Sequence, residues 1–99
     1  ELGAWFLDPE IEQTIEQSVE HAEHASHLNL PPQSVRLIVE AVMRGIGGAQ
    51  NTAVILTGSG ARYFLRQMIE SQAPQSAVIS HGEVPSSVRV VSYGSLKGV

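Results

Sequence analysis

The segment from residue 52 to residue 80 constrains the fold more than any other part of the sequence. It opens with TAVILT at 52–57, a short apolar and β-branched run that is typical of a strand buried on both faces. The turn GSG follows, and then ARYFLRQMIESQA, whose apolar residues recur on one face of a helix near 60–72. The run SAVIS at 76–80 predicts a second strand. The pattern indicates a β-α-β unit, which is parallel and right-handed in nearly all proteins.

The flanking residues predict one more strand and two more helices. In the stretch VRVVSYG, Val88, Val90 and Ser92 alternate with Arg89, Val91 and Tyr93, which predicts a third strand near 88–93. The short link before this strand favours an antiparallel return. A first helix is predicted near 8–26, because Asp8 suits the N-cap and Pro9 the first helical position. A second helix is predicted near 33–45, after the two prolines that end the first.

These elements indicate a small α/β (α+β) fold. We expect a three-stranded mixed sheet with a β-α-β unit, covered by an antiparallel N-terminal helix pair and one crossover helix. The 99 residues are expected to form a single domain, with the helix pair over 1–48 and the β-α-β-β unit over 49–99. Its buried residues are expected to include Ile11, Ile15, Val39, Val42, Val54, Leu56, Leu65 and Ile69.

Charge is distributed unevenly along the chain. Residues 1–35 carry seven acids and no Lys or Arg, whereas residues 36–99 carry six bases and three acids, so charges of −7 and +3 give the net −4. An acidic first third beside six scattered bases argues against a nucleic-acid surface. The absence of cysteine excludes disulfides and thiolate metal sites. The chain begins with Glu1 and not with Met, so we expect it to be a piece of a larger protein.

Three histidines, His21, His24 and His27, recur at every third position of VEHAEHASHLNL. In the predicted first helix they lie on the polar face, opposite the arc that carries Ile11 and Ile15. Two of them could bind Zn²⁺, but a structural site needs four ligands, and only His81 and a few carboxylates remain to supply the rest. We therefore expect a solvated helix end with exposed His24 and His27, and no metal or other cofactor.

No motif in the chain predicts catalysis. VILTGSGAR places glycines between a strand and a helix, but it lacks the Lys-Ser/Thr pair of a phosphate-binding loop and the third glycine of a dinucleotide fingerprint. Ser59 is expected to serve as the N-cap of the following helix. His81 has Glu83 and several serines nearby, a grouping that arises in almost any chain of this composition.

Three blocks of the sequence resemble the C-terminal end of the export-gate protein of type III secretion, the FlhA/SctV family. They are FLDPEIEQTIEQSV, then AVILTGSGARYFLRQMIESQAPQSAVISHGEVPSSVRV, and the closing VVSYGSL. The family has a strand before a helix with an early arginine, a strand ending in serine, and an acid before proline. The matching positions here are Val54 to Thr57, Arg62, Ser80, Glu83, Pro85 and Val88 to Tyr93. The block DPEIEQTI is nearer to the injectisome branch than to the flagellar one, while His81 replaces a frequent aromatic.

The resemblance implies a function without catalysis. The parent protein would be anchored in the bacterial inner membrane, and its cytoplasmic regions would form a homo-oligomeric ring below the export channel. That ring would receive chaperone–substrate complexes, a stalk protein and a gatekeeper, and this chain would be its membrane-distal sub-domain. The alternative class is a stand-alone protein-binding adaptor domain, and an α/β enzyme fragment that uses the Gly-rich turn is the weakest reading.

Two faces of the predicted helices suit protein docking. Glu12, Glu16 and Glu20 are spaced four residues apart on the first helix with no basic residue among them, which predicts an acidic stripe for a basic partner. Glutamine at all three positions is expected to leave the fold intact. Arg62, Tyr63 and Arg66 form the outer face of the third helix and are the second candidate docking surface.

Overall fold

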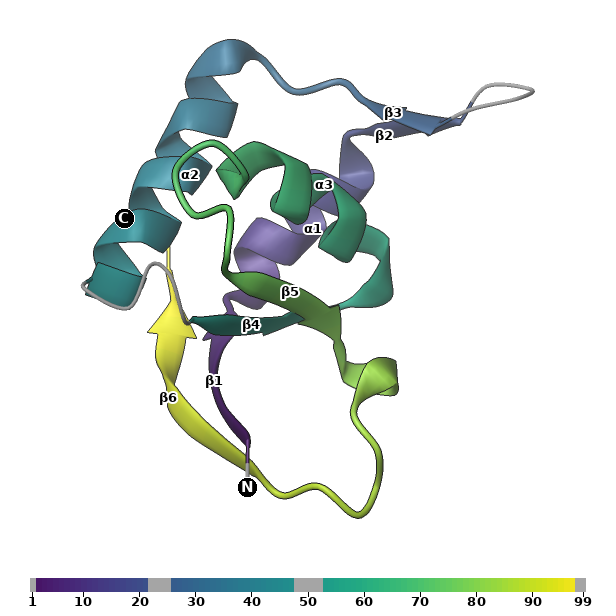
Figure 1. Ribbon diagram of the computed structural model, residues 1–99. Helices are drawn as coiled ribbons and strands as arrows, with labels where there is room; N and C mark the ends of the chain where they lie inside the picture. Colours follow the sequence, from purple (N-terminus) through teal and green to yellow (C-terminus); the bar gives the residue numbers. More distant parts are fainter. Residues whose placement is uncertain (1, 22–25, 48–52, 98–99) are drawn as a thin grey trace.

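The computed structural model describes residues 2–21, 26–47 and 53–97 (Figure 1). Within these ranges the chain forms six strands, three α-helices and one short 3₁₀ helix. Their bounds, in chain order, are β1 (Leu2–Leu7), α1 (Pro9–Gln17), β2 (Val19–His21), β3 (Ser26–Leu28), α2 (Pro32–Ile46), β4 (Val54–Thr57), α3 (Ser59–Ile69), β5 (Ala77–Ser80), η2 (His81–Glu83) and β6 (Val90–Leu96).

The main sheet has four strands in the order β5-β4-β1-β6, and all three neighbouring pairs are parallel. The predicted β-α-β unit is confirmed as β4-α3-β5. The prediction of three strands was wrong, because β1 at the N-terminus was not foreseen. It lies between β4 and β6, so residues from both halves of the chain build the sheet.

The predicted antiparallel return into β6 was also wrong. The link after β5 runs to the opposite edge of the sheet, where β6 pairs in parallel with β1 from Leu2↔Val90 to Leu7↔Leu96 (Figure 1). The register shifts by one residue between Ala4 and Trp5, where β6 bulges at Tyr93 and Gly94. Gly94 has a φ of 139°, which favours glycine at this position.

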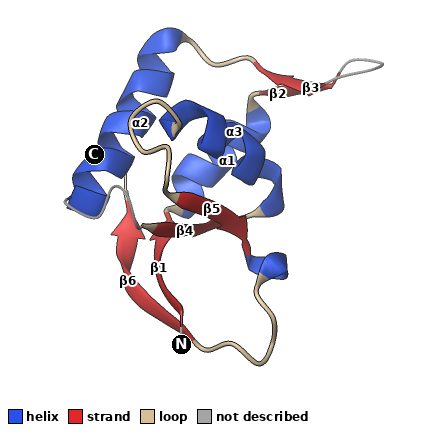
Figure 2. Ribbon diagram, in the orientation of Figure 1, coloured by secondary structure: helices blue, strands red, loops and turns tan. Residues whose placement is uncertain are grey.

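The three α-helices lie together on one side of the sheet, as Figure 2 shows. The fold class is confirmed as a mixed α/β fold, with α3 as the crossover helix from β4 to β5, and the parallel connection from β1 to β4 is a second crossover that contains α1 and α2. The two N-terminal helices are not each other's main partners, however, because α1 packs on α3, while α2 packs on β6 and α3. The shared core collects apolar side chains from every layer: Leu7, Ile11, Ile15, Ile38, Val39, Val42, Ile46, Ala53, Ile55, Ala61, Phe64, Leu65, Ile69, Val78 and Leu96.

Seven of the eight side chains predicted to be buried are in this core or equally buried. The exception is Val54, which is half-buried because it is the first residue of β4 and precedes the fully enclosed part of that strand. The α3 and α2 bounds differ from the predicted ranges by only a few residues.

The first helix is shorter than predicted. It ends at Gln17, where Ser18 caps it through its backbone N–H to the carbonyls of Ile15 and Glu16. The chain then enters a two-stranded antiparallel hairpin that pairs Val19 with Leu28 and Glu20 with His27. Val19 and Leu28 are directly opposite each other and both pack against the core, so burial of this pair competes successfully with helical periodicity.

The histidine prediction falls largely outside the described residues. His21 and His27 belong to β2 and β3, not to a helix, while His24 and the side chains of His21 and His27 lie outside the described part. Over the side chains that the structure does describe, no group of three or more His, Asp or Glu is placed to bind a metal ion. Nor does any described helix have the length and apolar character needed to cross a membrane.

Candidate functional site

The carboxyl ends of β4 and β5 bring together residues that are far apart in the sequence. Thr57 ends β4, Ser80 ends β5, and the first turns of α3 begin beside them. In open parallel sheets this edge is where loops and helix N-termini assemble sites. Two glutamates lie here, Glu83 from η2 and Glu12 from α1, and each binds a different part of the edge.

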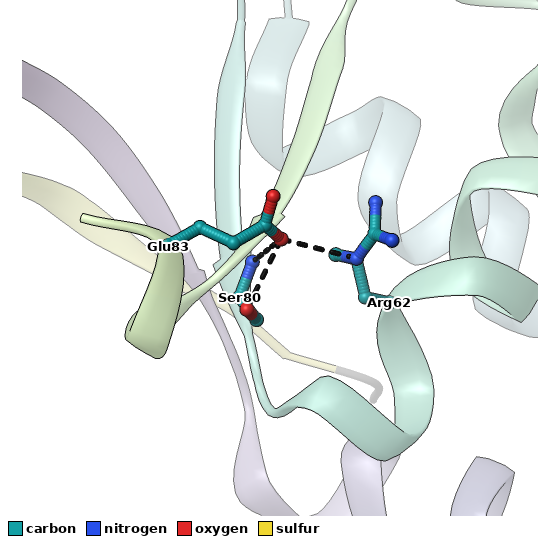
Figure 3. Close-up of polar contacts among 3 residues, drawn as sticks. All are labelled: Arg62, Ser80 and Glu83. Atoms are coloured by element: carbon teal, nitrogen blue, oxygen red, sulfur yellow. Dashed lines mark hydrogen bonds and ion pairs between the residues drawn. The ribbon is translucent and has the colours of Figure 1, made fainter.

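Glu83 holds together the end of β5 and the start of α3. Its Oε1 accepts hydrogen bonds from the backbone N–H of Ser80 at 2.9 Å and from the Ser80 hydroxyl at 3.0 Å. The same oxygen lies 3.1 Å from Nε of Arg62 (Figure 3). This cluster of Arg62, Ser80 and Glu83 joins three of the positions on which the family resemblance depends, although the sequence separates them by up to 21 residues.

The cluster favours the ionised form of Glu83. The backbone hydrogen bond from Ser80 is the main cause that lowers the pKa of Glu83, followed by the Ser80 hydroxyl, with a smaller contribution from the positive charge of Arg62. Because both side chains of the ion pair are nearly half exposed, water screens their attraction. The cluster therefore orients Arg62 and η2 more than it stabilises the fold.

A lowered pKa makes part of the stability depend on pH. A carboxyl group with a lower pKa in the folded state stabilises the fold above its unfolded pKa, and this contribution is lost as pH falls through the folded pKa. We expect the wild-type chain to be more stable than a Glu83→Gln variant at neutral pH, with the difference shrinking below about pH 4. Urea unfolding at a series of pH values measures this difference.

The control for this measurement is Glu70→Gln, at an exposed position just after the other end of α3. Its stability relative to the wild-type chain should change little between pH 7 and the acid range, at about the scale of a surface substitution. An equal pH dependence for both variants would contradict the role given to Ser80 and Arg62.

Glu12 caps α3 from another helix. Its Oε1 accepts hydrogen bonds from the hydroxyl of Thr57 at 3.1 Å and from the backbone N–H of Gly58 at 3.2 Å. Thr57 is completely buried, and Gly58 is the N-cap residue of α3, which has no capping side chain of its own. The prediction that Ser59 is the N-cap was therefore wrong. A carboxylate from α1 satisfies this end of the helix and complements its dipole.

Two glycines let the α1 acids approach so closely. A Cβ at Gly58 would lie 3.3 Å from Glu16 Oε1, and a Cβ at Gly60 would lie 2.9 Å from the same atom. The glycines of the GSG turn therefore make room for the protein's own carboxylates. That arrangement leaves the amide end of α3 poorly suited to a phosphate, because an anion would meet two glutamates there.

The predicted acidic stripe is not continuous. Glu12 is half-buried and bonded within the domain, Glu16 is exposed on α1, and Glu20 belongs to strand β2. Asn29 Nδ2 donates a hydrogen bond to Glu20 Oε1 at 2.6 Å, so this acid interacts with the hairpin's own flank. The expectation that glutamine at all three positions leaves the fold intact therefore does not suit Glu12.

The α3 face places its three predicted residues in different surroundings. Arg62 is paired with Glu83, and Arg66 Nη2 donates to the carbonyl of Pro74 at 3.1 Å while its Nη1 is buried without a partner. Tyr63 is 56% exposed. Its ring lies edge-on to Phe64, and its hydroxyl accepts a hydrogen bond from Gln67 at 2.9 Å. Tyr63 is thus the side chain of this face that is held in place and still open to a partner.

The fold and the cluster define a small α/β domain in which a glutamate from α1 caps α3, and comparison with known proteins identifies its family. The model of the FHIPEP family matches residues 1–89. The chain belongs to the FHIPEP family, as the resemblance predicted.

Curated relatives cover nearly the whole chain. Protein hrpC2 of Xanthomonas euvesicatoria is 33% identical over 95% of this chain and 15% of its own length. The flagellar biosynthesis protein FlhA of Bacillus subtilis is 30% identical over 85% of the chain and 13% of its own length. The chain thus spans only about a seventh of these relatives.

Solved structures of the family share the fold. CdsV of Chlamydia pneumoniae has a TM-score of 0.87 at 33% identity, covering 96% of this chain and 28% of that one. The C-terminal domain of InvA has a TM-score of 0.88 at 26% identity, covering 96% and 30%. The nonameric SctV-C of EPEC has a TM-score of 0.82 at 26% identity, covering 95% and 28%. These injectisome proteins support the injectisome side of the resemblance.

Proposed function

We propose that this chain is part of the cytoplasmic ring of a type III secretion export gate. Family membership over residues 1–89 supports the proposal, as does the nonameric assembly described for the related SctV-C of EPEC. The parent protein would be anchored in the bacterial inner membrane by a region outside this chain, and the domain would lie on the cytoplasmic face.

Within that ring, the domain would dock protein partners and perform no catalysis. The observation that carries this proposal is Tyr63, an exposed aromatic side chain whose ring and hydroxyl are both fixed by neighbours on α3. Tyrosines of this kind are frequent anchors of interfaces, because they offer a large contact area at a small entropic cost. A solved complex of CdsV with CdsO supports protein binding by a relative that is 34% identical to this chain.

Three kinds of partner fit this role: a stalk protein, a gatekeeper, and chaperone–substrate complexes. The outer face of α3, here called the Tyr63 face, carries Arg62 beside Tyr63 and Arg66 one turn later. This face suits a partner with acidic side chains around an apolar contact. The exposed acids Glu16 and Glu20 suit a basic element on the same or another partner. Glu12 would contribute indirectly, by fixing the start of α3.

A substitution at Tyr63 tests the docking role in the full-length protein. We expect Tyr63→Ala to reduce secretion at least about tenfold, the scale of losing one interface anchor, while protein level and ring assembly stay unchanged. The measurement is secretion by cells that carry the variant in place of the wild-type gene, together with the size of the purified ring.

Leu37→Ala provides the matched control. Leu37 is 63% exposed on α2, so its truncation removes a similar exposed apolar side chain from a different helix. Its secretion should match the wild type. Normal secretion by Tyr63→Ala would contradict the proposed docking role, whereas a ring that fails to assemble would place Tyr63 in contacts between subunits.

A further inference from the structure

Strand β6 presents an unpaired edge. Among the described residues it pairs only with β1, and it is the last strand of the sheet order. At seven residues it is also the longest strand, and most of its positions are exposed. A long exposed edge is a template on which another extended segment can pair.

The backbone pattern shows which groups are available on that edge. The N–H of Leu2 donates to the carbonyl of Arg89 at 2.7 Å, so the backbone groups of Arg89 are directed toward β1. Because the backbone groups of successive strand residues point to alternate sides, those of Val90 and Ser92 are directed away from β1. The bulge that follows satisfies its own amide, since Gly94 N–H donates to the Ser92 hydroxyl at 3.2 Å.

The side chains of β6 add an apolar contact. Tyr93 is 61% exposed although its ring lies 4.9 Å from that of Trp5 in an edge-to-face arrangement. Gly3 makes this position possible, because a Cβ there would overlap the Tyr93 ring. Val91 is 36% exposed. An extended partner that pairs with the edge can thus cover apolar side chains as well as backbone groups.

Charge selects the kind of partner. Arg89 and Lys97 are both exposed, one just before β6 and one just after it, and residues 84–97 contain no Asp or Glu. A second copy pairing antiparallel through the same strand would bring like charges together at both ends, which is unfavourable. A segment that carries carboxylates near its ends would neutralise them.

We propose that the open edge of β6 binds an extended acidic segment of a partner protein by strand addition. This surface is separate from the Tyr63 face, and the proposal does not depend on the docking role of that face. The partner segment forms a fifth strand next to β6, with its carboxylates near Arg89 and Lys97 and apolar side chains near Val91 and Tyr93.

A short synthetic peptide of alternating glutamate and valine is the probe. Added to the isotope-labelled chain, it should slow amide hydrogen exchange at Val90 and Ser92 in particular, as measured by NMR. Fluorescence of Trp5, the single tryptophan, should change as the peptide covers Tyr93, and this gives the affinity. A lysine–valine peptide of the same length should bind at least about tenfold more weakly at low salt.

Two variants test the two parts of the proposal. Val90→Pro removes one outward N–H at the first position of an edge strand, where proline is tolerated, and should weaken peptide binding at least about tenfold. Val90→Ala keeps the N–H and should bind as the wild type does. Arg89→Glu with Lys97→Glu should weaken binding about tenfold at low salt and less at high salt, whereas Arg36→Glu on α2 should have no effect.

Several results would overturn the proposal. One is unchanged exchange at Val90 and Ser92 with saturating peptide, which decides the matter on the wild-type chain even if Val90→Pro fails to fold. Another is equal binding of the acidic and basic peptides, which would mean that Arg89 and Lys97 do not select the partner and serve only to prevent edge-to-edge aggregation. Concentration-dependent dimerisation that Val90→Pro abolishes would assign the edge to a second copy of the chain.

Discussion

Replacing Leu96 by alanine should lower the free energy of unfolding by about 3 kcal/mol, within the range for fully buried leucines. Leu96 is the last residue of β6, and its side chain is completely buried against the core and α2. It fixes an edge strand whose other side chains are mostly exposed. Urea unfolding monitored by circular dichroism measures the change. A loss below about 1 kcal/mol would contradict this anchoring role.

A second substitution shows whether Leu96 packs on α2 as the structure places it. Alanine in place of a helix glycine normally stabilises by about 1 kcal/mol. At Gly45, however, the new Cβ would overlap Leu96 Cδ2, so Gly45→Ala alone should destabilise the wild-type chain by about 1 kcal/mol or more. In the Leu96→Ala background the clash is absent, and the same change should stabilise. Additive effects in the four-variant cycle would contradict the contact.

Replacing Glu12 by alanine should lower the free energy of unfolding by about 2 kcal/mol. The substitution leaves the buried hydroxyl of Thr57 and the N–H of Gly58 without their acceptor. A hydrogen bond to a charged group contributes about 1.5–3 kcal/mol to stability. It also removes a negative charge from the positive end of α3. Thermal and urea unfolding both report the change.

Glu10→Ala is the control for Glu12. Glu10 is an exposed acid in the first turn of the same helix, and its loss should cost only a few tenths of a kcal/mol through the α1 dipole. Glu12→Gln keeps an oxygen acceptor, so its loss in the free energy of unfolding should lie between those of Glu10→Ala and Glu12→Ala. Equal losses for Glu10→Ala and Glu12→Ala would show that the link from α1 to α3 contributes nothing to stability.

The fold was predictable where local pattern and tertiary packing agree. The run from residue 54 to residue 80 reads as strand, helix and strand, and β4-α3-β5 has that form because the apolar residues of all three elements pack into the shared core. The run Leu2–Leu7 was missed because it contains a glycine and has its partners at 54–57 and 90–96. No local signal specifies such distant pairing.

The hairpin was missed for a related reason. Residues 19–28 carry apolar residues at spacings that suit both a helix and a pair of short strands. Packing of Val19 and Leu28 decides between them, and it is a tertiary effect. The site was predictable in part. Arg62, Ser80 and Glu83 were selected by resemblance, but their meeting on one carboxylate oxygen depends on the 3₁₀ turn η2, which places Glu83 beside Ser80 and was not predicted from the sequence.

The parallel pairing of β1 with β6 also governs how the chain must fold. Leu2 pairs with Val90, so the ladder with the largest sequence separation in the sheet joins the two ends of the chain. Helices α1, α2 and α3 can form from local contacts, but β1 obtains its second neighbour only after β6 has been synthesised. The entropic cost of closing so long a loop precedes any gain from the contact. We therefore expect the pairing of β6 with β1 to form slowly, and the stability of the sheet to depend strongly on the residues of both strands.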